Sequence, residues 1–159
     1  MSDEPKFICD ANVGKLGKWL RIVGVDATFL DPRRDEELIL LARREGRIIL
    51  TTDSGIASRP YVERCLLIKS RDYREQLKEV CDAFGLQLSP ARVFSRCIEC
   101  NRPVEPAAKG DIEGRVAEHV LAEHDEFFLC PSCGRVYWPG THLRNTLESL
   151  RSMGVLAEG

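Results

Sequence analysis

The second half of this chain is constrained most by two Cys-x-x-Cys pairs, formed by Cys97, Cys100, Cys130 and Cys133. Each pair can place two thiolates on one tetrahedral metal ion, and two pairs complete the four-sulfur shell typical of structural zinc. Asn101 and Gly134 follow the pairs, and both residue types tolerate the left-handed backbone that closes such a turn. The spacing therefore predicts a zinc ribbon, and four sulfur ligands leave no open position for catalysis.

Two features of this segment bear on the zinc prediction. The 29 residues between the pairs (101–129) exceed the usual gap of a compact ribbon, so we expect an insertion, with a helix near residues 112–123. His119 and His124 are five positions apart, which does not put them on one helix face, so a second metal site is not expected there. The alternative is that the four cysteines are buried or redox-active thiols without metal.

Composition bounds the remaining possibilities. An odd count of seven cysteines argues against a disulfide framework, and Cys9, Cys65 and Cys81 are most simply buried thiols. The first residues are acidic and polar, and no run approaches the roughly 20 apolar residues of a membrane span. We therefore expect a cytoplasmic protein with no membrane partner. The net charge of −2 means that a nucleic-acid partner would need a local basic face.

Short apolar segments alternate with amphipathic ones up to about residue 95. Strands are predicted at residues 6–10, 26–30, 47–52 and 65–69, with a weaker one at 92–94, and helices at 16–23, 35–45 and 73–84. A short helix and loop are expected within residues 54–64, and a closing helix after His142. This alternation predicts an α/β fold, with a parallel sheet flanked by helices. The domains are expected at residues 1–95 and 96–159.

Three aspartates follow or precede these elements in a pattern that suggests a metal site. Asp10 ends the first strand, Asp53 follows the third, and Asp35 begins the second helix. The carboxyl ends of parallel strands meet at one edge, where open α/β folds bind ligands. Converging carboxylates require protons or cations, and hard oxygen ligands favour magnesium or manganese. Each acid also has a local alternative: Asp10 as a cap, Asp35 as a helix start, and Asp53 as a turn residue.

Several stretches resemble a known nuclease family. Residues 35–42 (DEELILLA) and 46–53 (GRIILTTD) look like the second half of a PIN-domain nuclease, which has a Rossmann-like fold. Residues 10–12 and 15–26 are similar to the opening of one PIN-like branch, the mut-seven C-terminal RNase domain family. That branch also carries a four-cysteine ribbon and an ending similar to residues 137–142 (YWPGTH). The resemblance runs from residue 7 to about 145.

The resemblance implies that Asp10, Asp35 and Asp53 bind the catalytic metal. For a fourth acid we favour Glu36, with Asp31 and Asp72 as alternatives, since many PIN nucleases carry one and this chain has no clear match. Thr52 stands where the family usually has arginine. Candidate RNA contacts are Lys15, Lys18, Arg21, Arg59, Trp138 and His142. The alternative for each is an ordinary role as a solvated surface charge or as a packed side chain.

The leading hypothesis is a divalent-metal-dependent endoribonuclease that cleaves single-stranded or structured RNA. The rival is a non-catalytic RNA- or ribosome-binding adaptor that keeps a degenerate PIN fold and its ribbon. A third possibility is a phosphatase that uses the same acids on a smaller substrate. Neither a Gly-rich phosphate loop nor a Gly-x-Ser-x-Gly motif occurs in the sequence, which gives nucleotide hydrolysis and acyl transfer no support.

Overall fold

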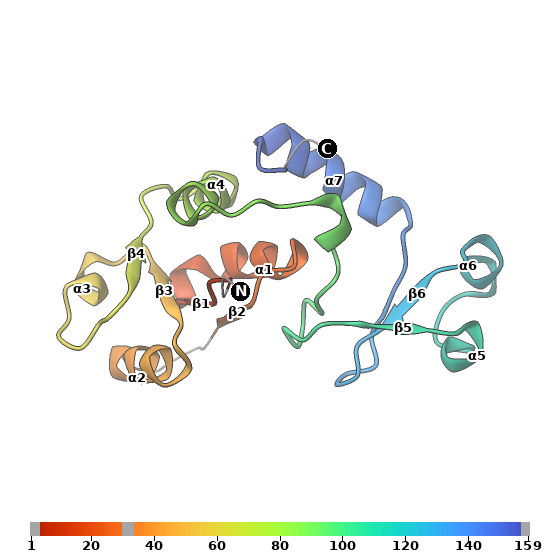
Figure 1. The fold of residues 1–159 in the computed structure, drawn as a ribbon, viewed down its shortest axis with the longest axis horizontal. Helices are drawn as coiled ribbons and strands as arrows, with labels where there is room; N and C mark the ends of the chain where they lie inside the picture. Colours follow the sequence, from red (N-terminus) through yellow and green to blue (C-terminus); the bar gives the residue numbers. More distant parts are fainter. Residues whose placement is uncertain (1–3, 30–33, 157–159) are drawn as a thin grey trace. The chain divides into compact units, whose positions relative to one another are not determined.

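The computed structural model describes residues 4–29 and 34–156, which form two compact units (Figure 1). The first unit comprises Met1–Arg21 and Val25–Gln87, and the second comprises Ile22–Gly24 and Leu88–Gly159. This division falls earlier in the chain than the 95/96 boundary expected from the sequence. In the described parts of both units, every helix is too short or too polar to cross a lipid bilayer.

The first unit contains a four-stranded sheet in the order β2-β1-β3-β4, with every neighbouring pair parallel. Its strands are β1 (Phe7–Cys9), β2 (Ala27–Phe29), β3 (Ile48–Thr51) and β4 (Cys65–Leu67). All residues of β1 and β3 are buried, as expected for central strands covered on both faces. The predicted parallel α/β architecture is confirmed, with each strand two residues shorter than expected.

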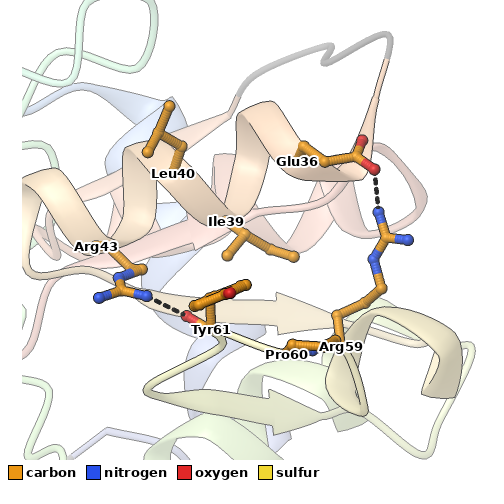
Figure 2. A pocket seen from close by; sticks show the side chains of 7 residues that line it. All are labelled: Glu36, Ile39, Leu40, Arg43, Arg59, Pro60 and Tyr61. Atoms are coloured by element: carbon orange, nitrogen blue, oxygen red, sulfur yellow. Dashed lines mark hydrogen bonds and ion pairs between the residues drawn. The ribbon is translucent and has the colours of Figure 1, made fainter.

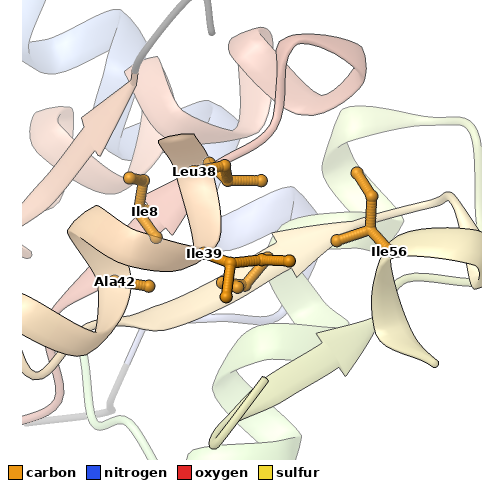
Figure 3. Close-up of a cluster of buried hydrophobic side chains, with 6 residues drawn as sticks. Ile8, Leu38, Ile39, Ala42 and Ile56 are labelled. Carbon is orange, nitrogen blue, oxygen red and sulfur yellow. The ribbon is translucent and has the colours of Figure 1, made fainter. Parts of the chain in front are cut away.

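Alternating side chains of the central strands pack against different helices. Ile8 of β1 and Ile49 of β3 form a buried cluster with α2 (Asp35–Glu45) and α3 (Ser54–Ala57), shown in Figure 3. On the opposite face, Phe7 makes an edge-to-face contact of 5.3 Å with Phe84 of α4 (Tyr73–Phe84). The bounds of α2 and α4 agree with the prediction, since glycines with left-handed backbone end both helices.

The helix α1 (Gly14–Ile22) follows a short 3₁₀ turn, η1 (Ala11–Val13), and lies close to the sheet at a glycine. A Cβ atom on Gly17 would lie 2.3 Å from Cε1 of Phe29 and 3.1 Å from Sγ of Cys9. Glycine at this position therefore permits the close approach of α1 to β1 and β2.

The second unit contains a three-stranded antiparallel sheet in the order β5-β6-β7. Its strands are β5 (Glu105–Ala107), β6 (Phe127–Leu129) and β7 (Val136–Tyr137). Two short helices, α5 (Lys109–Ile112) and α6 (Glu118–Glu123), lie in the connection between β5 and β6. The expected closing helix is α7 (Thr141–Met153).

Three local predictions are wrong. Residues 92–94 form no strand: Pro90 begins a 3₁₀ turn, η2 (Pro90–Arg92), and Phe94 has a φ of 61°, which a strand does not allow. The helix expected at 112–123 is interrupted, because Gly114 adopts a φ of 84° between α5 and α6. Cys65 is half-buried rather than buried, although Cys9 and Cys81 are buried as expected.

Candidate functional site

Asp10 and Asp53 are connected through Thr51 at the carboxyl edge of the parallel sheet. Thr51, the last residue of β3, is fully buried, and its hydroxyl donates to Oδ2 of Asp10 at 2.9 Å. The same hydroxyl accepts a hydrogen bond of 3.0 Å from the backbone N–H of Asp53. Parallel pairing of β1 with β3 places the ends of the two strands together, so residues 41 positions apart meet at one site.

Both aspartates also cap short helical segments. Oδ1 of Asp10 accepts from the N–H of Ala11 at 2.8 Å, and Oδ1 of Asp53 accepts from the N–H of Gly55 at 2.8 Å. The capping alternative is therefore confirmed for Asp10, whereas Asp53, for which a simple turn was the alternative, caps α3. Each carboxylate keeps further lone pairs, so capping does not exhaust its capacity to accept a proton or bind a cation.

Asp35 and Glu36 lie in the first turn of α2. The N-cap is Arg34, whose side chain makes no capping hydrogen bond, so Asp35 starts the helix without capping it. Glu36 forms an exposed ion pair with Arg59, with Oε1 and Nη2 2.5 Å apart. The pKa of the Glu36 carboxyl lies below its usual value, because it accepts hydrogen bonds from its own backbone amide and from Arg59. Asp31, an alternative fourth acid, lies outside the described residues.

The three aspartates do not converge tightly. Among the described residues, only the four cysteines form a group of at least three metal-type ligands within 4.8 Å of one another. Carboxylates that approached so closely without a cation would repel by roughly 4 kcal/mol per pair. Asp10 and Asp53 thus share an edge through Thr51, while Asp35 lies on a separate helix, in the first turn of α2.

A basic hollow of about 410 Å³ lies between the start of α1 and the start of α4. Its lining includes Asn12, Lys15, Arg71 and Arg74, together with the ring of Tyr73. Nζ of Lys15 lies 4.1 Å from the centre of that ring, which also stacks on Trp19 at 5.6 Å. Asp72 also lines the hollow, so three cations and one carboxylate surround the aromatic face and leave it with a net positive charge.

The remaining basic candidates of this unit differ in accessibility. Lys18 is exposed on α1, as expected. Arg21 is buried: its Nε donates to the carbonyl of Ala27 at 2.7 Å, and its guanidinium lies 4.0 Å from the ring centre of Phe29. The expectation that Arg21 contacts RNA is corrected, because this side chain holds α1 against β2. Arg59 reaches the surface beside Glu36.

The two Cys-x-x-Cys segments fold into matching turns. The N–H of Asn101 donates to the carbonyl of Cys97 at 2.9 Å, and the N–H of Gly134 donates to the carbonyl of Cys130 at 3.0 Å. Asn101 and Gly134 have φ values of 59° and 79°, which confirms the predicted left-handed closure. The four sulfur atoms all lie within 4.8 Å of one another, and all four cysteines are free thiols.

The sulfur spacing matches the size of a zinc ion. A tetrahedron with Zn–S distances near 2.3 Å has sulfur atoms about 3.8 Å apart, and Sγ of Cys97 lies 3.7 Å from Sγ of Cys133. Contact with Cys133 raises the pKa of Cys100 to about 12. Burial opposes ionisation of Cys97, but hydrogen bonds from Tyr137 and nearby backbone amides lower its pKa to about 7. Four thiolates this close require a cation.

Tyr137 supports this sulfur cluster from β7. Its hydroxyl donates to Sγ of Cys97 at 3.3 Å and accepts from the N–H of Ile98 at 3.0 Å. Burial, followed by the hydrogen bond to Cys97, raises the pKa of Tyr137, so the phenol stays protonated and remains a donor. Such outer hydrogen bonds orient metal ligands and tune their charge.

A groove of about 460 Å³ lies beside the cluster and brings together all three histidines of the chain, His119, His124 and His142. Trp138 also lines it. His142 stacks on Phe94 with ring centres 5.4 Å apart, so its packing alternative is confirmed. His142 nevertheless stays exposed, and Trp138 is half-buried. Both side chains can thus be reached from the groove.

The sequence reading missed several residues of these sites. The sequence pattern places Thr51 only within a strand, although a threonine at a strand end, two residues before an aspartate, is a recognisable polar signal. Arg71 and Arg74 flank Tyr73 at the start of α4, and their clustering with Lys15 depends on tertiary packing.

The chain resembles known proteins over most of its length. The family model described as "Mut7-C RNAse domain" matches residues 5–150 of the chain. A human protein named "Exonuclease mut-7 homolog" is 36% identical over 104 residues, which span 60% of this chain and 12% of that protein. The chain therefore corresponds to a small part of this relative. No solved structure matches the chain significantly. Because the family model covers nearly the whole sequence, the chain belongs to the Mut7-C RNase domain family.

Proposed function

We propose that this chain is a divalent-metal-dependent ribonuclease of the PIN type. The observation that carries the proposal is the Thr51 hydroxyl, which connects Asp10 and Asp53 at the carboxyl edge of a parallel sheet. Membership of an RNase domain family and the placement of Asp35 in the first turn of α2 support it. Magnesium or manganese, held by these three aspartates, would supply a Lewis acid for phosphodiester hydrolysis.

The residues around these acids have separate roles in the proposal. Thr51 fixes the orientation of Asp10, which keeps one carboxylate oxygen directed away from the cap. Glu36 is proposed as a fourth acid, although its ion pair with Arg59 must first open. Lys15, Arg71 and Arg74 would position phosphates in the hollow that Asn12, two residues after Asp10, also lines.

The second unit would provide a structural zinc site and an RNA contact. Zinc fits the sulfur tetrahedron, and Cys97, Cys100, Cys130 and Cys133 would be its ligands. Four sulfur ligands exclude substrate from that metal, so its role is to hold the two turns together. Trp138 and His142 would contact unpaired bases from the neighbouring groove.

A non-catalytic RNA-binding adaptor is the second candidate. It is favoured by the capping roles of Asp10 and Asp53, which account for both residues without any metal. Thr52, at the position where the PIN pattern usually has arginine, also removes one candidate phosphate contact.

Asp53→Asn tests the two candidates directly. Asparagine still caps a helix, so this variant should fold, while it removes the charge needed to hold a divalent cation. We expect cleavage of single-stranded RNA by the wild type with magnesium or manganese, loss in Asp53→Asn, and full activity in the exposed control Asp82→Asn. A circular RNA substrate distinguishes endonucleolytic from exonucleolytic cleavage, and mononucleotides test for phosphatase activity.

Equal cleavage by the wild type and Asp53→Asn would reject the carboxylate mechanism. Tight RNA binding without cleavage at any divalent metal would instead support the adaptor.

A further inference from the structure

A groove of about 460 Å³ lies along α2, on the face of the first unit that carries α3. Glu36, Ile39, Leu40 and Arg43 contribute from the helix, while Arg59, Pro60 and Tyr61 contribute from the segment that follows α3. Figure 2 shows Arg43 and Arg59 at opposite ends of this groove, with Tyr61 between them. We refer to it as the Tyr61 groove.

Tyr61 is unusual in both exposure and backbone conformation. Its side chain is 76% exposed, although most of its surface is an apolar ring, and nearby Leu40 is 60% exposed. Its φ of 73° lies in the left-handed region, which is strained for a bulky residue. Strain of this kind persists where the surrounding structure enforces it, and it is concentrated at binding sites.

Arg43 helps to hold Tyr61 in this conformation. Its Nη1 donates to the carbonyl of Tyr61 at 3.4 Å, and its guanidinium carbon lies 5.7 Å from the ring centre. The high exposure of the ring leaves room for a planar ligand to stack on it.

The charges at the two ends of the groove are accessible. Arg59 pairs with Glu36, and Arg43 pairs with Glu63 at 3.3 Å, with all four side chains at least 36% exposed. Exposed ion pairs contribute little to stability, so a phosphate can compete for either guanidinium. Glu36 and Arg43 are seven residues apart on one helix, or about 10 Å along its axis.

We propose that the Tyr61 groove binds an unpaired nucleobase of single-stranded RNA, stacked on Tyr61, with the flanking phosphates on Arg43 and Arg59. This inference rests on the proposed function, since Glu36 at one end of the groove neighbours Asp35 in α2. An aromatic ring between two guanidinium groups complements a base between two phosphates. A purely apolar peptide would use neither guanidinium, because Arg43 and Arg59 would keep their existing pairs with Glu63 and Glu36.

The test measures binding of a fluorescein-labelled oligouridylate by fluorescence anisotropy, in the zinc-loaded Asp53→Asn chain so that the probe stays intact. Tyr61→Ala should weaken binding roughly tenfold or more, because stacking on the ring is lost. Tyr61→Phe should keep the affinity, and Tyr61→Gly, which relieves the backbone strain, should lose it as Tyr61→Ala does. Leu67→Ala removes an exposed apolar side chain outside the groove and should have no effect.

Two further readouts locate the base. Photo-crosslinking with 4-thiouridine in the same RNA should label Tyr61, and a fully paired duplex should neither crosslink there nor respond to Tyr61→Ala. Unchanged oligouridylate affinity in Tyr61→Ala and Tyr61→Gly would overturn the inference and leave the proposed ribonuclease intact. Absence of RNA binding by every variant would overturn both.

Discussion

The hydroxyl of Thr51 donates to the carboxylate of Asp10 at 2.9 Å, although the two residues are 41 positions apart in the sequence. The same oxygen accepts from the backbone N–H of Asp53 at 3.0 Å. One buried hydroxyl therefore forms hydrogen bonds both to the carboxylate that follows β1 and to the backbone of the turn that follows β3.

Thr51→Val should disrupt this arrangement while it preserves the shape of the side chain. The substitution leaves the amide of Asp53 and one oxygen of Asp10 without their partner, which costs about 1–3 kcal/mol of unfolding free energy. Urea denaturation measures this loss. Thr51→Ser retains the hydroxyl and is the matched control. If Thr51→Val is as stable as the wild type, the hydroxyl does not support the site.

The basic hollow between the starts of α1 and α4 predicts a specific salt dependence of RNA binding. Lys15→Gln and Arg74→Gln should each weaken binding and reduce the slope of log K against log salt by about 0.7, as expected for one lost phosphate contact on a single strand. Lys78→Gln changes an exposed cation of α4 outside the hollow and should leave the slope unchanged. Equal slopes in all three variants would show that RNA phosphates do not contact the hollow. Binding titrations over a range of salt concentrations provide the measurement.

Gly17 should be sensitive to the addition of a single methyl group. In Gly17→Ala, the new Cβ would lie 2.3 Å from the Phe29 ring, which packs against Arg21, so neighbouring side chains must shift. We expect a loss of about 1–3 kcal/mol in thermal or urea unfolding. Gly14→Ala meets no atom within 4 Å and should be neutral or slightly stabilising. A stable Gly17→Ala protein would show that α1 can move away from the sheet at little cost.

The sequence predicted the elements whose signals are local. Asp35–Glu45 and Tyr73–Phe84 have amphipathic spacing and end at glycines, so both helices were placed correctly. The two Cys-x-x-Cys turns likewise carry their own closing residues, Asn101 and Gly134. Their geometry depends on a few adjacent residues, which is why spacing alone was sufficient.

Features that depend on distant partners were not predictable in this way. Arg21 resembles any exposed helical arginine in the sequence, yet it is buried because β2 offers the carbonyl of Ala27 and the ring of Phe29. The strained backbone of Tyr61 likewise has no local signal, since bulky residues rarely adopt a positive φ. Tertiary contacts override local preference at both positions.

The buried thiol of Cys9 predicts a pH effect on stability. Burial raises the pKa of Cys9 from 9.0 to about 12, so the unfolded chain releases this proton before the folded one does. The contribution is fully present below pH 9 and is lost as the pH rises to about 12, with a slope of up to about 1.4 kcal/mol per pH unit. Urea unfolding of Cys9→Ala should show a shallower alkaline decline than the wild type. Identical slopes would mean that Cys9 is accessible to ionisation in the folded state.

Tyr137→Phe should weaken zinc binding without removing a ligand. The phenol donates to Sγ of Cys97, and this hydrogen bond offsets part of the thiolate charge that the metal would otherwise have to balance. Loss of an outer-shell partner typically lowers metal affinity 10- to 100-fold, which competition with a chromogenic chelator measures. Tyr73→Phe removes a hydroxyl in the first unit and should retain zinc like the wild type.

Because the ring of Tyr137 stays packed against Phe94 in Tyr137→Phe, a drop in zinc affinity with unchanged stability of the first unit would assign the effect to the hydroxyl. Equal zinc affinity in Tyr137→Phe and the wild type would show that the four thiolates alone determine the strength of the site.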